Sequence, residues 1–289
     1  MEFLENEQLK IIIHPKGAEL VSLFDKSSGT EYLWQGDPAF WNKHSPVLFP
    51  IVGTLKDNAY FHKDQRYELS RHGFAREMIF DVVKQEKDRI VFSLYSSSET
   101  LEKFPFPFQF DISYQLKEKQ LQVTYSISNT GDTEMFFSVG GHPAFRLPVD
   151  PATVYNDYFL DFAQEENAGR WPISADGLIE KEPIPLLNGT LLPLSKSLFQ
   201  KDALVFKDLR SSSLHLKSQK TTKGFTFAFE GFPYLGIWAA KDADFVCIEP
   251  WCGIADSVDS NQELSQKEGI NRLEAGGIFE RQWSVEIFK

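Results

Sequence analysis

Cysteine is scarce in this sequence, because only Cys247 and Cys252 occur among 289 residues. Two cysteines are too few for the disulfide framework of a small secreted protein, and their spacing fits neither a zinc knuckle nor a short redox motif. We therefore interpret both as reduced side chains that pack in the interior, since a free cysteine usually behaves as a small hydrophobic residue.

Basic residues and long apolar runs are also lacking. The chain has 30 basic and 41 acidic side chains, a formal net charge of -11, and an acidic surface of this size repels phosphate backbones and anionic lipid headgroups. No stretch of about 18 apolar residues occurs, and the first residues have neither the basic start nor the apolar core of a signal peptide. We expect a cytoplasmic protein with no nucleic-acid partner and no membrane partner.

Motifs for metals, nucleotides and a nucleophilic serine are absent as well. The sequence contains no H-E-x-x-H pair, no G-x-S-x-G elbow and no glycine-rich phosphate loop. Two histidines and one glutamate are a known ligand set for zinc and iron. The one short local spacing, His62-Lys63-Asp64, lies in a charged segment with no third ligand nearby. The sequence therefore predicts neither a metal nor a cofactor.

The sequence does have the composition of a globular protein with a large core, with 42% apolar and 14% aromatic residues. Apolar and polar side chains alternate through almost the whole chain, which is the pattern of half-buried strands. The clearest alternating segments are 9–13, 20–24, 90–94, 112–116, 121–127 and 279–287. All-β domains of roughly 200 to 250 residues are common. We predict an all-β fold in which residues 1–289 form one large, mainly antiparallel domain.

Three segments depart from this regular alternation. Between residues 148 and 199 the alternation weakens and prolines and glycines are frequent, which predicts a long surface excursion with short strands. The proline-flanked segment 46–50 is predicted at a sheet edge or bend. The only helical signal is a turn or two that begins at Asp259 or Ser260.

Glu249 follows the apolar segment 245–248 and is itself followed by Pro250. Because proline stops a buried strand, we expect Glu249 where the strand gives way to a loop. Alternation puts its side chain on the same face as Phe245 and Cys247, where partial burial would raise the pKa of the carboxyl group. Such a group is a candidate general base, although a solvated carboxylate at a strand end fits the sequence equally well.

Two of the six histidines, His72 and His142, lie beside glycines in loops next to predicted strands. The glycines before His142 let a ligand approach closely, and Pro143 stiffens the exit. Each histidine is a candidate for catalysis, but without a partner for acid or base work it would be a structural, hydrogen-bonding residue. Arg71 and Arg76 are likewise candidates for either ligand binding or surface ion pairs.

Four short motifs occur together in order: Arg71-His72-Gly73-Phe74-Ala75-Arg76, Gly141-His142-Pro143-Ala144-Phe145, Lys201-Asp202-Ala203-Leu204-Val205-Phe206 and Cys247-Ile248-Glu249-Pro250-Trp251. In this order and spacing the sequence resembles the aldose 1-epimerase (galactose mutarotase) family, most closely its LacX-like bacterial branch. The resemblance extends over nearly the whole chain. It implies a β-supersandwich with an open sugar-binding cleft, and interconversion of the α and β anomers of a free aldose without a cofactor.

The resemblance also implies a role for individual residues. Glu249 matches the general base that takes the proton of the anomeric hydroxyl, and His142 matches the general acid that protonates the ring oxygen. His72 matches a second histidine near the same oxygen, and Asp202 matches the aspartate that holds sugar hydroxyls. This chemistry needs one base and one acid beside the anomeric carbon and involves no redox change.

The sequence departs from the family pattern at Thr54, where many members carry an arginine that contacts the sugar. Lys56 is the nearest substitute, and we expect Lys56 and Arg71 among the substrate ligands. Arg71, Arg76 and Lys56 are also suited to a phosphate, so a hexose-6-phosphate 1-epimerase is the alternative enzyme. A sugar-binding protein without turnover is the alternative from another class. The physiological sugar and the oligomeric state stay open at this point.

Overall fold

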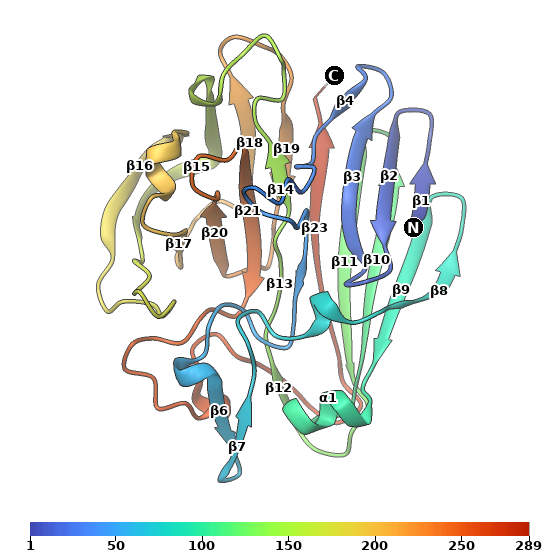
Figure 1. Cartoon of the computed structure of the whole chain (residues 1–289), viewed down its shortest axis with the longest axis vertical. Coiled ribbons are helices and arrows are strands. Elements are labelled where there is room, and N and C mark those ends of the chain that lie inside the picture. The colour runs from blue at the N-terminus through green and yellow to red at the C-terminus, as the bar shows by residue number, and fades with distance from the viewer. Residues whose placement is uncertain (289) are drawn as a thin grey trace.

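The computed structural model describes residues 1–288 and consists mainly of antiparallel β-strands, which confirms the predicted all-β class (Figure 1). The largest sheet has nine strands in the order β16-β15-β18-β19-β23-β11-β10-β9-β8. These strands span Ile184–Pro193 (β16), Tyr158–Arg170 (β15), Ser213–Ser218 (β18), Phe225–Ala228 (β19), Ile278–Ile287 (β23), Gln120–Asn129 (β11), Phe108–Lys117 (β10), Arg89–Tyr95 (β9) and Asp81–Gln85 (β8).

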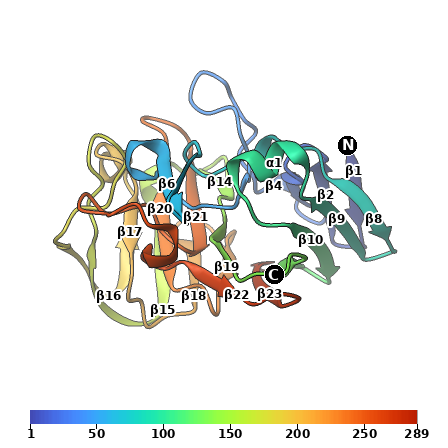
Figure 2. The same ribbon diagram turned by 90° about the horizontal axis from the view of Figure 1, so that it is seen from below.

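A second sheet has six strands in the order β17-β20-β21-β13-β5, and β14 also pairs with β21. These strands span Leu204–Phe206 (β17), Tyr234–Trp238 (β20), Phe245–Cys252 (β21), Val139–Gly141 (β13), Val47–Leu48 (β5) and Ala144–Arg146 (β14). Seen from below, β17, β20 and β21 form a layer that faces β15, β16 and β18 of the larger sheet (Figure 2). The proline-flanked segment 46–50 contains the edge strand β5, which confirms its predicted position.

The remaining elements are short. A four-stranded sheet is formed by Glu2–Glu5 (β1), Leu9–His14 (β2), Glu19–Asp25 (β3) and Thr30–Glu31 (β4). Two strand pairs are formed by Ala59–His62 (β6) with Gln65–Glu68 (β7) and by Met135–Phe137 (β12) with Asn271–Leu273 (β22). The helices are Ser98–Lys103 (α1) and the 3-10 segments Lys56–Asn58, Ala75–Glu77, Tyr155–Asp157, Lys196–Phe199 and Leu264–Gln266. Within residues 1–288, none of these helices has the length and apolar character needed to cross a membrane.

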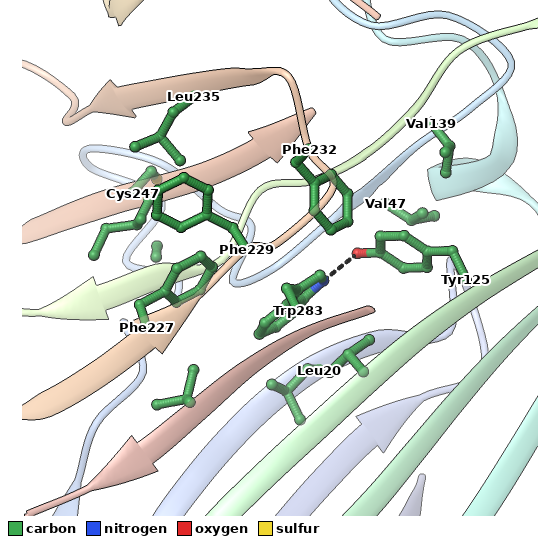
Figure 3. Packing of buried hydrophobic residues seen from close by; sticks show 14 of the residues in the cluster. Leu20, Val47, Tyr125, Val139, Phe227, Phe229, Phe232, Leu235, Cys247 and Trp283 are labelled. Carbon is green, nitrogen blue, oxygen red and sulfur yellow. Dashed lines mark hydrogen bonds between the residues drawn. The ribbon is translucent and has the colours of Figure 1, made fainter. Parts of the chain in front are cut away.

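A large hydrophobic core connects the sheets and contains buried residues from Leu4 near one end of the chain to Ile287 near the other. At its centre the Trp283 indole of β23 donates a hydrogen bond to the Tyr125 hydroxyl of β11 at 2.9 Å (Figure 3). The same indole stacks on Phe227 of β19, with ring centroids 5.5 Å apart. A core that is continuous through both sheets supports our proposal that the whole chain forms one domain.

The segment between residues 148 and 199 is more regular than its sequence predicts. β15 and β16 are long strands that pair with each other, and β15 also pairs with β18, so both extend the nine-stranded sheet. Few β16 side chains are buried, and register shifts interrupt the pairing of β15 with β16. The alternation of apolar and polar residues is therefore weak here although the strands are long.

The helical elements also differ from the prediction. Helix α1 begins after Ser97, whose Oγ accepts a hydrogen bond from the Thr100 N–H at 3.3 Å while the Thr100 hydroxyl accepts one from the Ser97 N–H at 2.8 Å. Six residues are too few to display a period of 3.6, so this capping pair is the only sequence signal for the helix. The helical turn predicted after Ser260 is the short 3-10 segment Leu264–Gln266.

Candidate active site

Glu249 lies in the middle of β21, so the prediction that the strand ends at Pro250 is wrong. A proline is tolerated here because the neighbouring strand is interrupted between β13 and β14. The Ile248 N–H donates to the Pro143 oxygen in this gap at 3.2 Å. The backbone N–H of residue 250 would point toward the same neighbouring strand as that of Ile248. Pro250 has no N–H, so it leaves no unpaired donor at the interruption.

The gap between β13 and β14 brings His142 into line with Glu249. β13 pairs Gly140 with Trp251, and β14 continues after the gap in the same antiparallel register along β21. This register puts position 142 directly opposite position 249. Opposite residues of antiparallel strands project from the same face with their side chains adjacent. Two residues more than a hundred positions apart in the sequence therefore meet.

His142 and Glu249 are in direct, buried contact. The His142 Nε2 atom lies 3.2 Å from the Glu249 Oε2 atom, and the two side chains are 9% and 2% exposed. The Trp41 ring stacks on the His142 imidazole with centroids 5.0 Å apart, and the Trp238 ring meets it edge-on at 5.6 Å. These aromatic contacts fix the orientation of the imidazole.

Burial shifts the proton affinities of this pair in opposite directions. Loss of hydration raises the pKa of Glu249 well above its usual value and lowers the pKa of His142 to about 3. Both shifts favour the neutral form of each group, and because the two groups touch, a proton can pass from Glu249 to His142. One member of the pair can therefore release a proton while the other takes one.

His72 lies beside the pair, with its ring edge-on to that of His142 at a centroid distance of 5.7 Å. The Gly53 N–H donates to the His72 Nδ1 atom at 3.1 Å, and the Arg71 Nε–H donates to the His72 Nε2 atom at 3.3 Å. Burial holds the pKa of His72 well below its usual value, with help from His142, Arg71 and Arg76. His72 is therefore a neutral imidazole held between Gly53 and Arg71.

A cavity of about 410 Å³ opens over the pair, a size that suits a small organic ligand. Glu249 and His142 line it together with His72, Asp202 and Arg71. An Arg71 guanidinium nitrogen and an Asp202 carboxylate oxygen lie 3.7 Å apart there. Five of the six predicted site residues therefore meet at one cavity, although they come from four separate parts of the sequence.

Lys56, the sixth predicted residue, is placed differently. Its ammonium group donates to the backbone oxygen of Ser260 at 3.3 Å, and it is not among the described residues that line the cavity. The nearby Thr54 packs against the segment around Gly177, where an added Cβ would lie only 2.6 Å from the Thr54 Oγ1 atom. Gly177 itself lines the cavity, so this segment occupies the space beside Thr54.

Arg76, a candidate for ligand binding in the sequence, also lines the cavity. Several lining residues are not predicted from the sequence: Trp41, Trp238, Trp251 and Lys241. The Trp251 indole lies flat between glycines on the two neighbouring strands. A Cβ added to Gly140 would lie 2.7 Å from the indole, and a Cβ added to Gly236 would lie 2.5 Å from it. Glycine inside a strand often marks such a close approach, so the glycine within the apolar segment 234–238 is the signal that could have revealed this cavity floor.

Comparisons of sequence identify the family. A profile of the family described as aldose 1-epimerase matches residues 3–269. The protein LacX of Lactococcus lactis subsp. lactis, in both its plasmid and its chromosomal forms, is 32% identical over 281 residues, which are 93% of this chain and 93% of LacX. The chain belongs to the aldose 1-epimerase family. The resemblance carried by the four short motifs is thereby confirmed.

Solved structures agree with this assignment. A galactose mutarotase related enzyme from Lactobacillus acidophilus superposes with a TM-score of 0.94 at 35% identity, covering 100% of this chain and 97% of that one. A galactose mutarotase-like protein from Lactobacillus casei ATCC 334 gives 0.92 at 32% identity, covering 99% of each chain. A galactose mutarotase-like protein from Clostridium acetobutylicum gives 0.78 at 20% identity over 99% and 94%, a likeness of fold alone. The family member described here therefore has the galactose mutarotase-like fold.

Proposed function

We propose that the protein is an aldose 1-epimerase that interconverts the α and β anomers of a free aldose. The observation that supports this best is the buried contact of His142 with Glu249 at 3.2 Å beside the cavity. Ring opening of an aldose removes a proton from one oxygen of the anomeric carbon and adds one to the other oxygen. A paired acid and base at one place supply both transfers.

Unpaired polar atoms in the cavity lining support a ligand with many oxygens. Within the described part of the chain, two buried nitrogens of lining residues have no hydrogen-bond partner: Arg76 Nε and His142 Nδ1. A buried polar group without a partner costs about 1–3 kcal/mol, so such groups are expected where a ligand completes their bonding. A sugar can supply several partners at once, because almost every carbon carries an oxygen.

The proposed reaction conserves protons at each step. The reaction begins from the arrangement in which the proton of the pair has passed to His142 and Glu249 is a carboxylate. Glu249 takes the proton of the anomeric hydroxyl while His142 gives its proton to the ring oxygen, the bond from the anomeric carbon to that oxygen breaks, and an aldehyde forms. Rotation about the adjacent carbon–carbon bond then presents either face of the carbonyl. The same two transfers in reverse close the ring, and the pair again holds one proton. The residues themselves return to their starting state, so no cofactor is consumed.

We assign the neighbouring polar groups to substrate binding. His72 lies near the ring oxygen, the Asp202 carboxylate accepts from sugar hydroxyls, and the Arg71 guanidinium donates to them. The flat face of Trp251 offers an apolar surface to the C–H side of the sugar ring. Lys56 is not part of this assignment, because its ammonium group is engaged with Ser260 at 3.3 Å.

A hexose-6-phosphate 1-epimerase is the second candidate. Arg71, Arg76 and Lys241 all line the cavity, and several charged donors together hold a phosphate dianion well. The threonine at position 54, in place of an arginine, counts against this candidate. A sugar-binding protein without turnover is the third candidate, and the complete pair of Glu249 and His142 counts against it.

Polarimetry on freshly dissolved α-anomers separates the three candidates. We expect the protein to accelerate the mutarotation of at least one free aldose in a panel that includes galactose and glucose. Acceleration with glucose 6-phosphate alone would support the second candidate instead. Sugar binding in calorimetry without acceleration for any member of the panel would support the third.

A further inference from the structure

A thiol lies next to the acid–base pair and has no role in the proposed reaction. Cys247 precedes Glu249 by two residues in β21, so both side chains project from the same face of the sheet. One imidazole nitrogen of His142, the Cys247 Sγ atom and one Glu249 carboxylate oxygen all lie within 4.8 Å of one another. The cluster therefore presents a nitrogen, a sulfur and an oxygen to a common point beside the cavity.

We propose that His142, Cys247 and Glu249 bind a zinc ion, and that the bound ion inhibits the protein by occupying both members of the acid–base pair. Zinc binds nitrogen, sulfur and oxygen ligands at about 2.0–2.3 Å in tetrahedral sites, which separates neighbouring ligand atoms by roughly 3.3–3.8 Å. The 3.2 Å between His142 and Glu249 is already close to this separation. The Cys247 Sγ atom needs a shift of no more than roughly 1.5 Å to complete the set.

The ligand types select the ion. Magnesium and calcium prefer six or more oxygen ligands, whereas a thiolate with an imidazole favours zinc. His142 and Glu249 line the cavity, so the fourth position of the ion faces the cavity and is filled by water or a sugar hydroxyl. Three protein ligands with one open position form the arrangement of an exchangeable zinc site, not that of a closed structural one.

The surroundings of His142 limit the strength of this site. A histidine that binds zinc usually donates its other ring N–H to a carboxylate or carbonyl, and loss of such a partner weakens metal binding about 10- to 100-fold. The buried Nδ1 atom of His142 has no hydrogen-bond partner among residues 1–288. We therefore expect reversible inhibition that a chelator removes.

Cobalt is the probe for this site, because Co²⁺ takes the ligands of zinc and a thiolate bound to it gives a strong near-ultraviolet charge-transfer absorption. Metal-free wild-type protein, Cys247→Ala and Cys252→Ala are each titrated with Co²⁺ and then with Zn²⁺. Cys252 is the matched control, since it is the other buried cysteine and its Sγ atom contacts the Gly231 oxygen at 3.7 Å. We expect the absorption in wild type and Cys252→Ala, its loss in Cys247→Ala, and at least tenfold weaker zinc binding in Cys247→Ala.

Absorption that is missing from the wild type, or that survives in Cys247→Ala, overturns the proposal. Thermal melting checks that each variant is folded. If Cys247→Ala does not fold, Cys247→Ser takes its place. If Cys247→Ser does not fold either, the cobalt titration of the wild type alone decides between the outcomes. Polarimetry with and without Zn²⁺ then tests inhibition, with each protein compared with its own metal-free rate. The cobalt spectrum does not depend on turnover. If the protein does not accelerate mutarotation, the proposed function is contradicted, and the metal titration still tests the zinc site by itself.

Discussion

The centre of the nine-stranded sheet and the middle of the six-stranded sheet are built differently. β10 and β11 pair from Phe108 opposite Asn129 to Lys117 opposite Gln120 without a register shift, and half-buried and buried side chains alternate along β11. β21 is buried along its whole length, contains a proline and is bordered on one side by two short strands with a gap between them. The regular pairing builds a scaffold, and the interrupted pairing builds the cavity.

This difference predicts which property each region controls. Substitutions in the regular sheet remove packing or satisfied hydrogen bonds, so they should lower stability and leave catalysis unchanged. Substitutions at the gap remove groups that are unpaired or carry shifted pKa values, so they should lower catalysis and leave stability nearly unchanged. The variants below test this division, beginning with the largest expected effect.

Glu249→Gln should have the largest effect on catalysis. The amide keeps the shape of the carboxylate but cannot take a proton, and loss of a general acid or base usually lowers the rate about 10²- to 10⁴-fold. Polarimetry should show this loss while calorimetry shows sugar binding largely retained. A mutarotation rate equal to that of the wild type would reject the assignment of Glu249 as the base.

Gly236→Ala should disturb the floor of the cavity at the position directly opposite Glu249. Its new Cβ would lie 2.5 Å from the Trp251 indole, and a displacement of about 1 Å at a binding site can cost about 100-fold in rate. We expect kcat/KM to fall roughly ten- to hundredfold. The matched control is the double variant Gly236→Ala with Trp251→Phe, whose smaller ring relieves the clash. A loss in Gly236→Ala that the double variant does not reduce would contradict this explanation.

Tyr114→Phe is the corresponding test in the regular sheet. The buried Tyr114 hydroxyl of β10 donates to the Ala18 backbone oxygen at 2.6 Å, and removal of one partner leaves that oxygen unpaired. We expect the free energy of unfolding, measured with urea, to fall by about 1–3 kcal/mol while kcat/KM stays at the wild-type value. A fall in kcat/KM as large as that of the cavity variants would erase the distinction between the two sheets.

The pH dependence of stability provides the smallest effect. Burial raises the pKa of Glu249 in the folded protein well above its usual value of 4.5, so the folded state keeps a proton that the unfolded state releases. The stability from this proton is fully present below about pH 4.5 and is lost as the pH rises toward the folded-state pKa. The free energy of unfolding of the wild type should therefore fall relative to Glu249→Gln above that pH, by at most about 1.4 kcal/mol per pH unit. Urea denaturation at several pH values measures this difference, and a constant value would contradict the shift.

The sequence predicts the regular part of the fold better than the irregular part. Alternation reveals β10 and β11 because one face of each is buried, but it misses the length of β16, whose side chains are mostly not buried. It also ends β21 too early at Pro250, because the local sequence does not show that the neighbouring strand is interrupted there.

The candidate site shows the same division. Motifs in the sequence bring Glu249, His142 and Asp202 to attention, and all three line the cavity. Trp251 ends the fourth motif, but its place in the cavity floor depends on glycines in two other strands. The burial of Cys247 is confirmed. Alternation already puts Cys247 on the face of Glu249, but strand pairing that linear spacing does not reveal brings His142 to them.

The most direct test of the proposed acid–base pair is the exchange between the α and β anomeric protons of a free aldose at equilibrium, measured by magnetisation-exchange NMR. With galactose or another sugar of the panel, we expect wild-type protein to raise the exchange rate well above the spontaneous value and Glu249→Gln to return it to that value. An exchange rate that wild-type protein leaves unchanged for every free aldose tested would contradict the proposed function.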